Sequence, residues 1–249
     1  MITPKQIEKV AMPPEKRASA KNDYFAFYIG RPITYWLTVP FLYTSITPNS
    51  ISLISIIPLI IGFVYSYFAS TIPEYVLTWI WFFLWALLDG VDGNVARYRG
   101  QSSKLGSVYD ALGGYIATVL APFACGIMAS HEHGFFEMNY QIETDVYVIL
   151  GALSGIFCLL PRLVMHKMIN ILGNNSNTSS IGDTNHLSLL KLITLNLISV
   201  TGFAQLFMLI AALTDTMDIY TVFYFIVNTI VMGVSLVSMF RNNSKDVLS

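Results

Sequence analysis

A short stretch between residues 89 and 110 gathers the residue types of this chain that are suited to chemistry. Asp89 and Asp92 are followed by Arg97, and a third carboxylate comes at Asp110. The run Phe82–Leu88, directly before them, is strongly apolar. An acidic side chain at membrane depth costs roughly 2.5–3.5 kcal/mol on insertion scales, so three of them near one membrane face need a compensating partner. A divalent cation is the partner that this pattern favours.

Helical spacing predicts that the first two carboxylates share a face with small residues. If the helix that contains Leu88 runs on to about Arg99, where Gly100 can end it, its positions i, i+3, i+4 and i+7 form one face. Those positions are Asp89, Asp92, Gly93 and Ala96. The missing side chain of a glycine lets a bulky polar ligand approach the backbone closely.

The third carboxylate is expected on the next helix. Ser102 or Ser103 is a suitable N-cap for a helix on which Gly106 and Asp110 lie on one face. A short turn brings the two faces together, which predicts a pocket with carboxylates on its walls. Oxygen ligands of this kind suit Mg²⁺, Mn²⁺ or Ca²⁺ rather than zinc. A hard cation in turn suits a diphosphate, and Arg97, with Arg99 or Lys104, is placed to hold phosphate oxygens.

Composition indicates that these helices lie in a membrane. The chain has 249 residues, of which 54% are hydrophobic and only 12% charged, about half the charge of a soluble domain. We therefore predict an all-α integral membrane protein with six transmembrane helices. The six apolar segments are Ile51–Phe68, Tyr75–Leu88, Leu105–Met128, Val146–Ile171, Leu187–Leu213 and Ile219–Phe240. A polar stretch, Gly173–Ser180, is predicted to be a plain linker before the fifth of them.

The distribution of charge predicts the orientation. If the N-terminus is cytosolic, all 14 Lys and Arg residues fall in or beside the cytosolic loops. The positive-inside rule then places both termini, and the mouth of the acidic pocket, in the cytosol. The small size and the composition, rich in Asn and Ile, favour a bacterial plasma membrane.

A seventh apolar stretch, Tyr24–Tyr43, contains Arg31, Pro32 and Pro40. We expect it to lie as an amphipathic helix in the cytosolic interface, and a kinked true span is the alternative. The predicted organisation is therefore a cytosolic N-terminal region with an interfacial helix, residues 1–46, and a six-helix transmembrane catalytic domain, residues 47–249.

The acidic stretch resembles the CDP-alcohol phosphotransferase family (CDP-alcohol phosphatidyltransferases). The family pattern is D-x2-D-G-x2-A-R-x8-G-x3-D-x3-D. Seven of its fixed positions match in residue type and spacing: Asp89, Asp92, Gly93, Ala96, Arg97, Gly106 and Asp110. The six-span layout and the turn Thr47-Pro48-Asn49 are also similar to the family.

The resemblance implies a reaction, a metal and a site. Members transfer a phospho-alcohol unit from a CDP-linked donor to a hydroxyl acceptor and release CMP. It implies that the aspartates bind Mg²⁺ or Mn²⁺, that at least one substrate is a lipid, and that the protein is a homodimer with its site open to the cytosol. The implied metal ligands are Asp89, Asp92 and Asp110, and the implied nucleotide-binding residues are Asn49, Asp89, Asp92, Gly93, Ala96, Arg97 and Gly106.

One position departs from the pattern. Its last aspartate, a metal ligand and the favoured general base of the family, falls at Gly114. Three interpretations stay open. The enzyme works with Asp110 as base and fewer ligands; another carboxylate, a water or a substrate group fills the gap; or the chain binds nucleotide without turnover. Loss of a general base typically costs about 10²–10⁴-fold in rate, so Gly114 weakens the mechanism more than the class.

Two basic residues near the inner end of the fourth segment are candidates for the acceptor site. Arg162 follows Pro161 inside an apolar run, and His166 and Lys167 share its helical face. Arginines within a membrane are functional by default, so we expect Arg162 and Lys167 to hold a phosphate or an anionic acceptor. The alternative is that they snorkel to the interface.

The function predicted from sequence is a membrane phosphotransferase with Asp89, Asp92 and Asp110 as its catalytic residues. Its place is in the synthesis of phospholipids or related glycoconjugates. The rival is a membrane protein that binds a CDP-linked donor without catalysis, or a small transporter. Transporters bury carboxylates at mid-membrane and are built from similar halves. This chain has neither feature, which favours the enzyme.

Overall fold

The computed structural model describes residues 2–132, 134–172 and 189–243, and the regular elements within them are all helices. Five of these helices are long and apolar enough to cross a membrane, which confirms the prediction of an all-α integral membrane protein. They are α4 (Pro48–Ser66), α5 (Ile72–Arg99), α6 (Lys104–Ser130), α8 (Asp145–Leu172) and α12 (Met217–Asn243). The predicted linker 173–180 lies outside the described residues.

The ends of the helices that carry the acidic motif follow local signals. Thr47 caps α4, because its hydroxyl accepts from the backbone N–H of Ser50 at 3.2 Å and Pro48 comes first in the helix. Gly100 ends α5 with φ of 65°, a left-handed conformation that favours glycine. Ser103 then caps α6 by accepting from Gly106 N at 2.9 Å. Together these two ends confine the turn between α5 and α6 to residues 100–103.

The fifth predicted segment differs from expectation, because it is two helices rather than one. Helix α10 covers Leu189–Ile198 and α11 covers Phe203–Thr214. At the break between them the N-terminal region supplies polar partners. The Ser199 hydroxyl donates to Asp23 at 2.6 Å, and the Asn196 side chain accepts from Tyr24 N at 2.9 Å. These side-chain bonds fix the N-terminal region to the bundle at the break.

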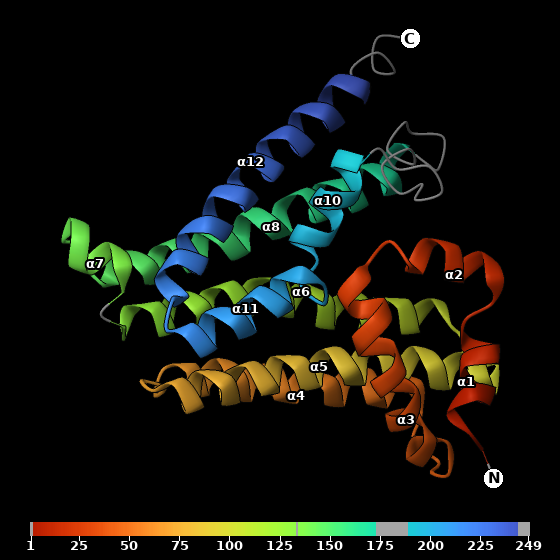
Figure 1. Ribbon diagram of the computed structural model, residues 1–249. Helices are drawn as coiled ribbons and strands as arrows, with labels where there is room; N and C mark the ends of the chain where they lie inside the picture. The colour runs from red at the N-terminus through yellow and green to blue at the C-terminus, as the bar shows by residue number, and fades with distance from the viewer. Residues whose placement is uncertain (1, 133, 173–188, 244–249) are drawn as a thin grey trace.

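The N-terminal helices gather at one end of the bundle. They are α1 (Pro4–Ala11), α2 (Pro14–Ala20), the π-helix η1 (Ala26–Gly30) and α3 (Arg31–Leu42). Figure 1 shows them beside the turn that joins α5 to α6, while α7 (Phe135–Tyr140) lies at the opposite end. The exposed fractions of Tyr28 and Trp36 are 61% and 71%. Their place in a membrane interface stays a prediction. The division of the chain into an N-terminal region, residues 1–46, and a transmembrane domain, residues 47–249, also stays a prediction.

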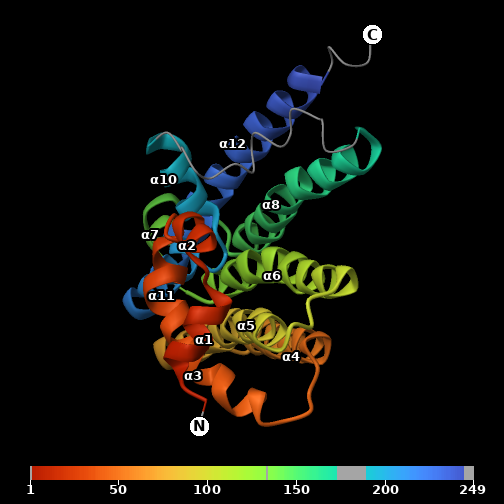
Figure 2. The same cartoon turned by 90° about the vertical axis from the view of Figure 1, so that its right-hand side faces the viewer.

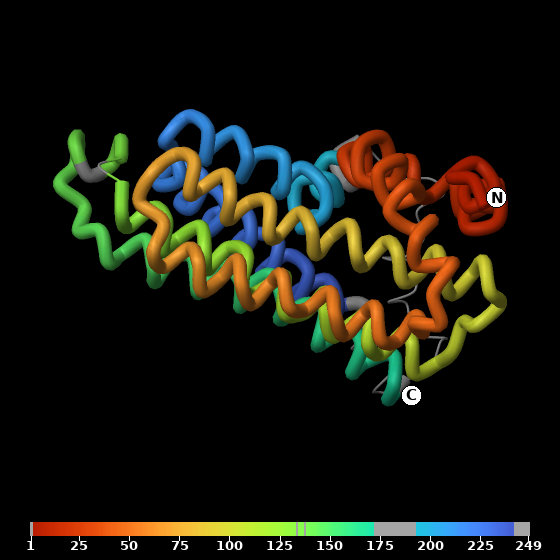
Figure 3. Tube along the Cα trace, turned by 90° about the horizontal axis from the view of Figure 1, so that it is seen from below, coloured from red at the N-terminus to blue at the C-terminus, as the bar shows by residue number. Residues whose placement is uncertain are grey.

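Helices α5 and α6 each have several neighbours in the bundle. Helix α5 packs against α3, α4 and α11, and α6 packs against α4, α8 and α12. Figure 3 shows the long helices side by side along one axis, and Figure 2 shows α8 and α12 leaning away from α4 and α5. Helices α6 and α8 approach closely at Gly126 and Gly151, where an added Cβ would lie 2.4 Å and 2.6 Å from backbone oxygens of the other helix. Asn228 of α12 donates to Ser154 of α8 at 2.8 Å. The close packing and this hydrogen bond hold the helices that flank α6 in place.

Candidate active site

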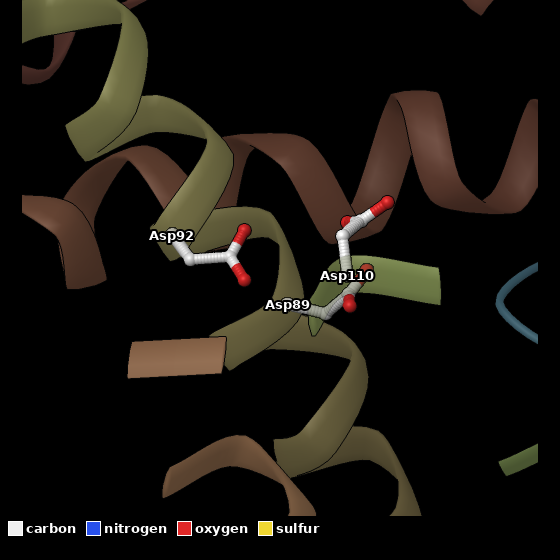
Figure 4. Close-up of side chains that lie close together, drawn as sticks. All are labelled: Asp89, Asp92 and Asp110. Carbon is white, nitrogen blue, oxygen red and sulfur yellow. The ribbon is translucent and has the colours of Figure 1, made fainter. Parts of the chain in front are cut away.

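The three motif aspartates lie together where α5 passes into α6. Asp89 and Asp92 come from successive turns of α5, and Asp110 comes from α6 across the turn. One carboxylate oxygen of each lies within 4.8 Å of the others. Figure 4 shows the three side chains facing a common space. The helical spacing and the tight turn are sufficient to bring them together.

The surroundings of these carboxylates fit a divalent cation. Asp92 is buried, Asp89 is half-buried and Asp110 is exposed. Within the described residues, no Lys or Arg side chain forms an ion pair with any of the three. The buried Ser52 hydroxyl of α4 donates to Asp92 and fixes the orientation of its carboxylate. Clustered carboxylates with oxygen neighbours and no ion-paired basic side chain among the described residues are the ligand set that Mg²⁺ or Mn²⁺ prefers.

A first cavity, here the motif cavity, opens beside Asp92 and Asp110. Five of the residues implied as nucleotide-binding line it besides Asp92: Asn49, Gly93, Ala96, Arg97 and Gly106. Asp89 is not among the lining residues of this cavity. Asn49 belongs to the first turn of α4, so three helices and the α5–α6 turn contribute to one hollow.

The two motif glycines of this cavity lie close to polar side chains. A Cβ on Gly93 would lie 3.0 Å from a guanidinium nitrogen of Arg97, so the arginine side chain folds back across the glycine. A Cβ on Gly106 would lie 3.1 Å from Asn49 Oδ1 and 3.1 Å from Ser103 Oγ. Both contacts are tighter than ordinary van der Waals contacts. The glycines therefore let polar side chains line the cavity at short range.

A second cavity, the Gly114 cavity, lies on the other side of the carboxylates. It is lined by Asp89 and Asp110, by α6 residues around Gly114, by Arg162 of α8 and by the break between α10 and α11. Arg162 donates to Thr118 Oγ1 at 3.1 Å. Lys167, which the sequence paired with Arg162, is exposed and is not among the residues that line this cavity. The structure therefore brings Arg162 to the carboxylates but not Lys167.

Gly114 leaves open space in this cavity. A Cβ added there would meet no heavy atom of the described residues within 4 Å. The neighbouring Tyr115 hydroxyl is hydrogen-bonded to Nδ1 of His166, and both residues line the cavity wall. No carboxylate of the described residues stands in for the missing aspartate among the lining residues, other than Asp89 and Asp110.

Several residues near the carboxylates were missed by sequence reasoning. Arg31 lines a third cavity together with Asp89, and its buried Nε has no partner among the described residues. Partial burial and the charges of Arg97 and Arg31 lower the pKa of Lys16 to about 8, with Asp110 opposing the shift. The sequence presents Lys16 and Arg31 only as evidence for topology, whereas Arg97 is already a predicted phosphate-binding residue.

Ser52 and Trp85 were also missed. Trp85 precedes Asp89 by four residues and so shares its helical face, a signal that the sequence did contain. Ser52 lies on another helix, and nothing in its local sequence points to Asp92.

A protein-family model matches most of the chain. The model of the CDP-alcohol phosphatidyltransferase family matches residues 45–240, which is well over half of the chain and includes the whole acidic motif. No curated protein matches the chain. Proteins of this family transfer substituted phosphate groups, and they generally depend on divalent metals. The match covers all five candidate spans and the lining of the motif cavity, and on that basis this chain belongs to the CDP-alcohol phosphatidyltransferase family.

Proposed function

We propose that this protein transfers a phospho-alcohol or phosphatidyl unit from a CDP-linked donor to a hydroxyl acceptor and releases CMP. The observation that carries the proposal is the position of Asp110, which lines both the motif cavity and the Gly114 cavity. A transferase needs two substrates that meet at one reacting centre. Two cavities that share a carboxylate wall supply that arrangement.

The motif cavity is the proposed donor site. Asn49, Gly93, Ala96 and Gly106 form walls of small or polar groups against which a cytidine fits. Arg97 presents a guanidinium beside Gly93, where it is suited to phosphate oxygens. A diphosphate bound here lies next to Asp92 and Asp110.

Asp89, Asp92 and Asp110 are the proposed ligands of Mg²⁺ or Mn²⁺. Such an ion, when bound, neutralises diphosphate charge and stabilises the charge that develops during transfer. Ser52 keeps the Asp92 carboxylate oriented toward the shared space. This role explains why three acidic groups lie together although none of them forms an ion pair with a Lys or Arg of the described residues.

The chemical step that we propose uses residues of both cavities. The acceptor hydroxyl oxygen attacks the β-phosphorus of the donor and forms the new P–O bond. The bond from that phosphorus to the bridging oxygen breaks, and CMP leaves with the oxygen. Asp110 takes the proton of the acceptor hydroxyl, since it is the exposed carboxylate between the two cavities. Arg162 holds the acceptor, or its phosphate, from the α8 side.

The cellular setting is also a proposal. The positive-inside bias supports a cytosolic site and cytosolic termini, the composition supports a bacterial plasma membrane, and the family supports a place in lipid synthesis. Family resemblance supports a homodimer. Accessibility of single cysteines placed at the exposed residues Lys104 and Asp145, probed in intact cells, tests the orientation.

The second candidate function is donor binding without turnover, or transport. Gly114 favours it, since the family pattern has its base at that position. The two functions differ in one measurable event, which is the release of CMP.

The test is CMP release by purified protein in detergent or nanodiscs. Mg²⁺ or Mn²⁺ is supplied with CDP-diacylglycerol or water-soluble CDP-alcohols and with a panel of acceptors: glycerol, glycerol 3-phosphate and inositol. We expect metal-dependent release, which Asp92→Asn reduces by at least about 10³-fold because it removes a ligand at the reacting centre. Asp145→Asn, a carboxylate exposed at the other end of the bundle, is the matched control and keeps the wild-type rate.

The opposite result also decides the question. If no donor and acceptor pair yields CMP while calorimetry shows metal-dependent binding of CDP, the binding protein is the correct assignment. If CDP does not bind with either metal, both candidates are wrong.

A further inference from the structure

One polar group in the Gly114 cavity is not used by the function proposed above. The Trp85 side chain is 3% exposed, and its indole N–H finds no hydrogen-bond partner among the described residues. A buried N–H donor without a partner is costly and is therefore rare in folded proteins. Trp79, two turns earlier on α5, shows the usual solution, since its indole N–H donates to Gln205 O at 2.8 Å.

The position of this N–H points to a ligand rather than to a packing defect. Trp85 is one of the residues that line the Gly114 cavity. Gly113 of the facing helix α6 lies close to it: an added Cβ there would lie 3.5 Å from Trp85 Nε1 and 3.9 Å from Asp89 Oδ1 and Ser55 Oγ. The N–H therefore lies near the carboxylate of Asp89, a proposed metal ligand, at a place where Gly113 has no side chain to cover it.

The cavity identifies which substrate is involved. Trp85 is not among the residues that line the motif cavity, where the donor nucleotide is proposed to bind. It shares the second cavity with Arg162 and His166 of α8. The atom that completes the hydrogen bond then belongs to the acceptor, and it must be an oxygen with a free lone pair.

We propose that Trp85 determines acceptor specificity by donating its indole N–H to an acceptor oxygen other than the attacking hydroxyl. The inference rests on the proposed function and adds the class of acceptor. The acceptor carries a second oxygen function, a hydroxyl or an acidic group, close to the hydroxyl that reacts. A lipid with a single isolated hydroxyl leaves the N–H unpaired and is a poor substrate.

The first experiment compares two tryptophan variants. Trp85→Phe keeps an aromatic ring and removes the N–H, and we expect the KM for the acceptor to rise about fivefold to tenfold, as for loss of one buried hydrogen bond. The affinity for CDP, measured by calorimetry, stays within about twofold. Trp79→Phe is the matched control. It loses a hydrogen bond that only supports the fold, so its melting temperature falls and its acceptor KM does not change.

A second variant tests the same bond without altering the tryptophan. Gly113→Ala places a methyl group at ordinary contact distance from the N–H and covers it. We expect the same selective rise in acceptor KM. The proposal is overturned if the acceptor KM stays at the wild-type value in Trp85→Phe. If that variant does not fold, an unchanged KM in Gly113→Ala overturns it instead. A fall in CDP affinity equal to the change in acceptor KM assigns Trp85 a structural role and also overturns it.

A spectroscopic readout separates this inference from the proposed function. The chain has four tryptophans, so the indole ¹⁵N–¹H resonance of Trp85 is assigned by its absence in Trp85→Phe. Glycerol, glycerol 3-phosphate and inositol are titrated in turn. A shift of that resonance supports the inference even if no CMP is released, in which case the proposed function alone fails. If CMP is released and the resonance shifts with none of the three, the inference fails while the function stands.

Discussion

Two clusters of buried or half-buried carboxylates lie at opposite ends of the bundle and have opposite surroundings. At the α5–α6 end, Asp89 and Asp92 project from the middle of a helix, where backbone N–H groups are already paired within the helix. At the other end, Glu132 accepts from the backbone N–H groups of Met217 and Asp218 at 3.1 Å and 3.3 Å. Asp218, which has no exposed surface, accepts from Phe136 N at 2.9 Å and from Ile219 N at 2.7 Å.

The difference shows how a structural carboxylate is told from a functional one. Glu132 and Asp218 bind the unpaired N–H groups at the starts of α12 and α7, so the fold itself provides their partners. The motif aspartates have no such donors beyond Ser52 and the α5 backbone, and they face open cavities. Their partner has to come from outside the chain. Burial alone does not separate the two clusters, because Asp92 and Glu132 are both 4% exposed.

The comparison predicts its largest effect for Asp92→Asn, which should lose activity without losing stability. The loss of at least about 10³-fold in CMP release corresponds to roughly 4 kcal/mol. We expect no accompanying fall in melting temperature without metal, because an amide in place of a buried carboxylate still accepts from Ser52 and costs less to desolvate. Thermal melts of the two proteins in the same detergent measure this. A large fall in melting temperature would place Asp92 with the structural carboxylates.

The opposite result, loss of stability without a change in substrate binding, is expected when Asp218 is replaced. Asp218→Ala leaves the N–H of Phe136 without its acceptor in a buried position, which costs about 1–3 kcal/mol in the free energy of unfolding. The melting temperature should fall by several degrees, while the KM values of the folded fraction stay unchanged. Asp218→Asn is the control, since it keeps one acceptor oxygen and should lose less. A change in the KM for the donor would contradict the structural role.

Those features of the fold that depend on neighbours in sequence could be predicted. Apolar run length predicted five of the six spans, and the end of α5 at Gly100 and the cap at Ser103 follow from local backbone chemistry. The proximity of Asp89, Asp92 and Asp110 follows from helical periodicity and one tight turn. Each of these depends on interactions within a few residues, which a sequence displays directly.

The features that could not be predicted depend on contacts between distant segments. The break between α10 and α11 is bonded to Asp23 and Tyr24, more than 170 residues away in sequence. The polar residues and Gly202 near Ser199 permit a break, but nothing in the local sequence indicates that Asp23 and Tyr24 bind there. Ser52, Arg31 and Lys16 reach the site in the same way, from helices that the tertiary packing brings to it. Lys167 was paired with Arg162 by helical spacing, but spacing did not decide which side chain faces the cavity.

A smaller effect is expected from restoring the family pattern with Gly114→Asp. A Cβ added at this position meets no heavy atom of the described residues within 4 Å, so the variant should fold. We expect the acceptor KM to rise about tenfold, because the new carboxylate fills part of the acceptor cavity, and metal-dependent CDP binding to persist. Gly114→Ala is the control, since it adds side-chain volume without adding a charge. A faster rate in Gly114→Asp would instead show that the natural site is a degraded one.

The smallest effect concerns the pH dependence of stability at the structural end. Burial raises the pKa of Glu132 to about 8, and the nearby Asp215 and Asp218 charges add to this, while the N–H donors of α12 oppose it. Because the pKa in the folded protein is above that of the unfolded chain, the contribution to stability is present at low pH. It is lost as the pH rises through about 8.

We therefore expect the melting temperature of the wild type to fall by about 2–4 °C between pH 6 and pH 9, the size of a change near 1 kcal/mol. Glu132→Gln keeps an acceptor for the α12 N–H groups and cannot ionise, so its melting temperature should vary less over the same range. Equal slopes in the two proteins would assign the pH dependence to other groups. In that case Glu132 is ionised in the folded protein, because the N–H donors of Met217 and Asp218 outweigh the cost of burying its charge.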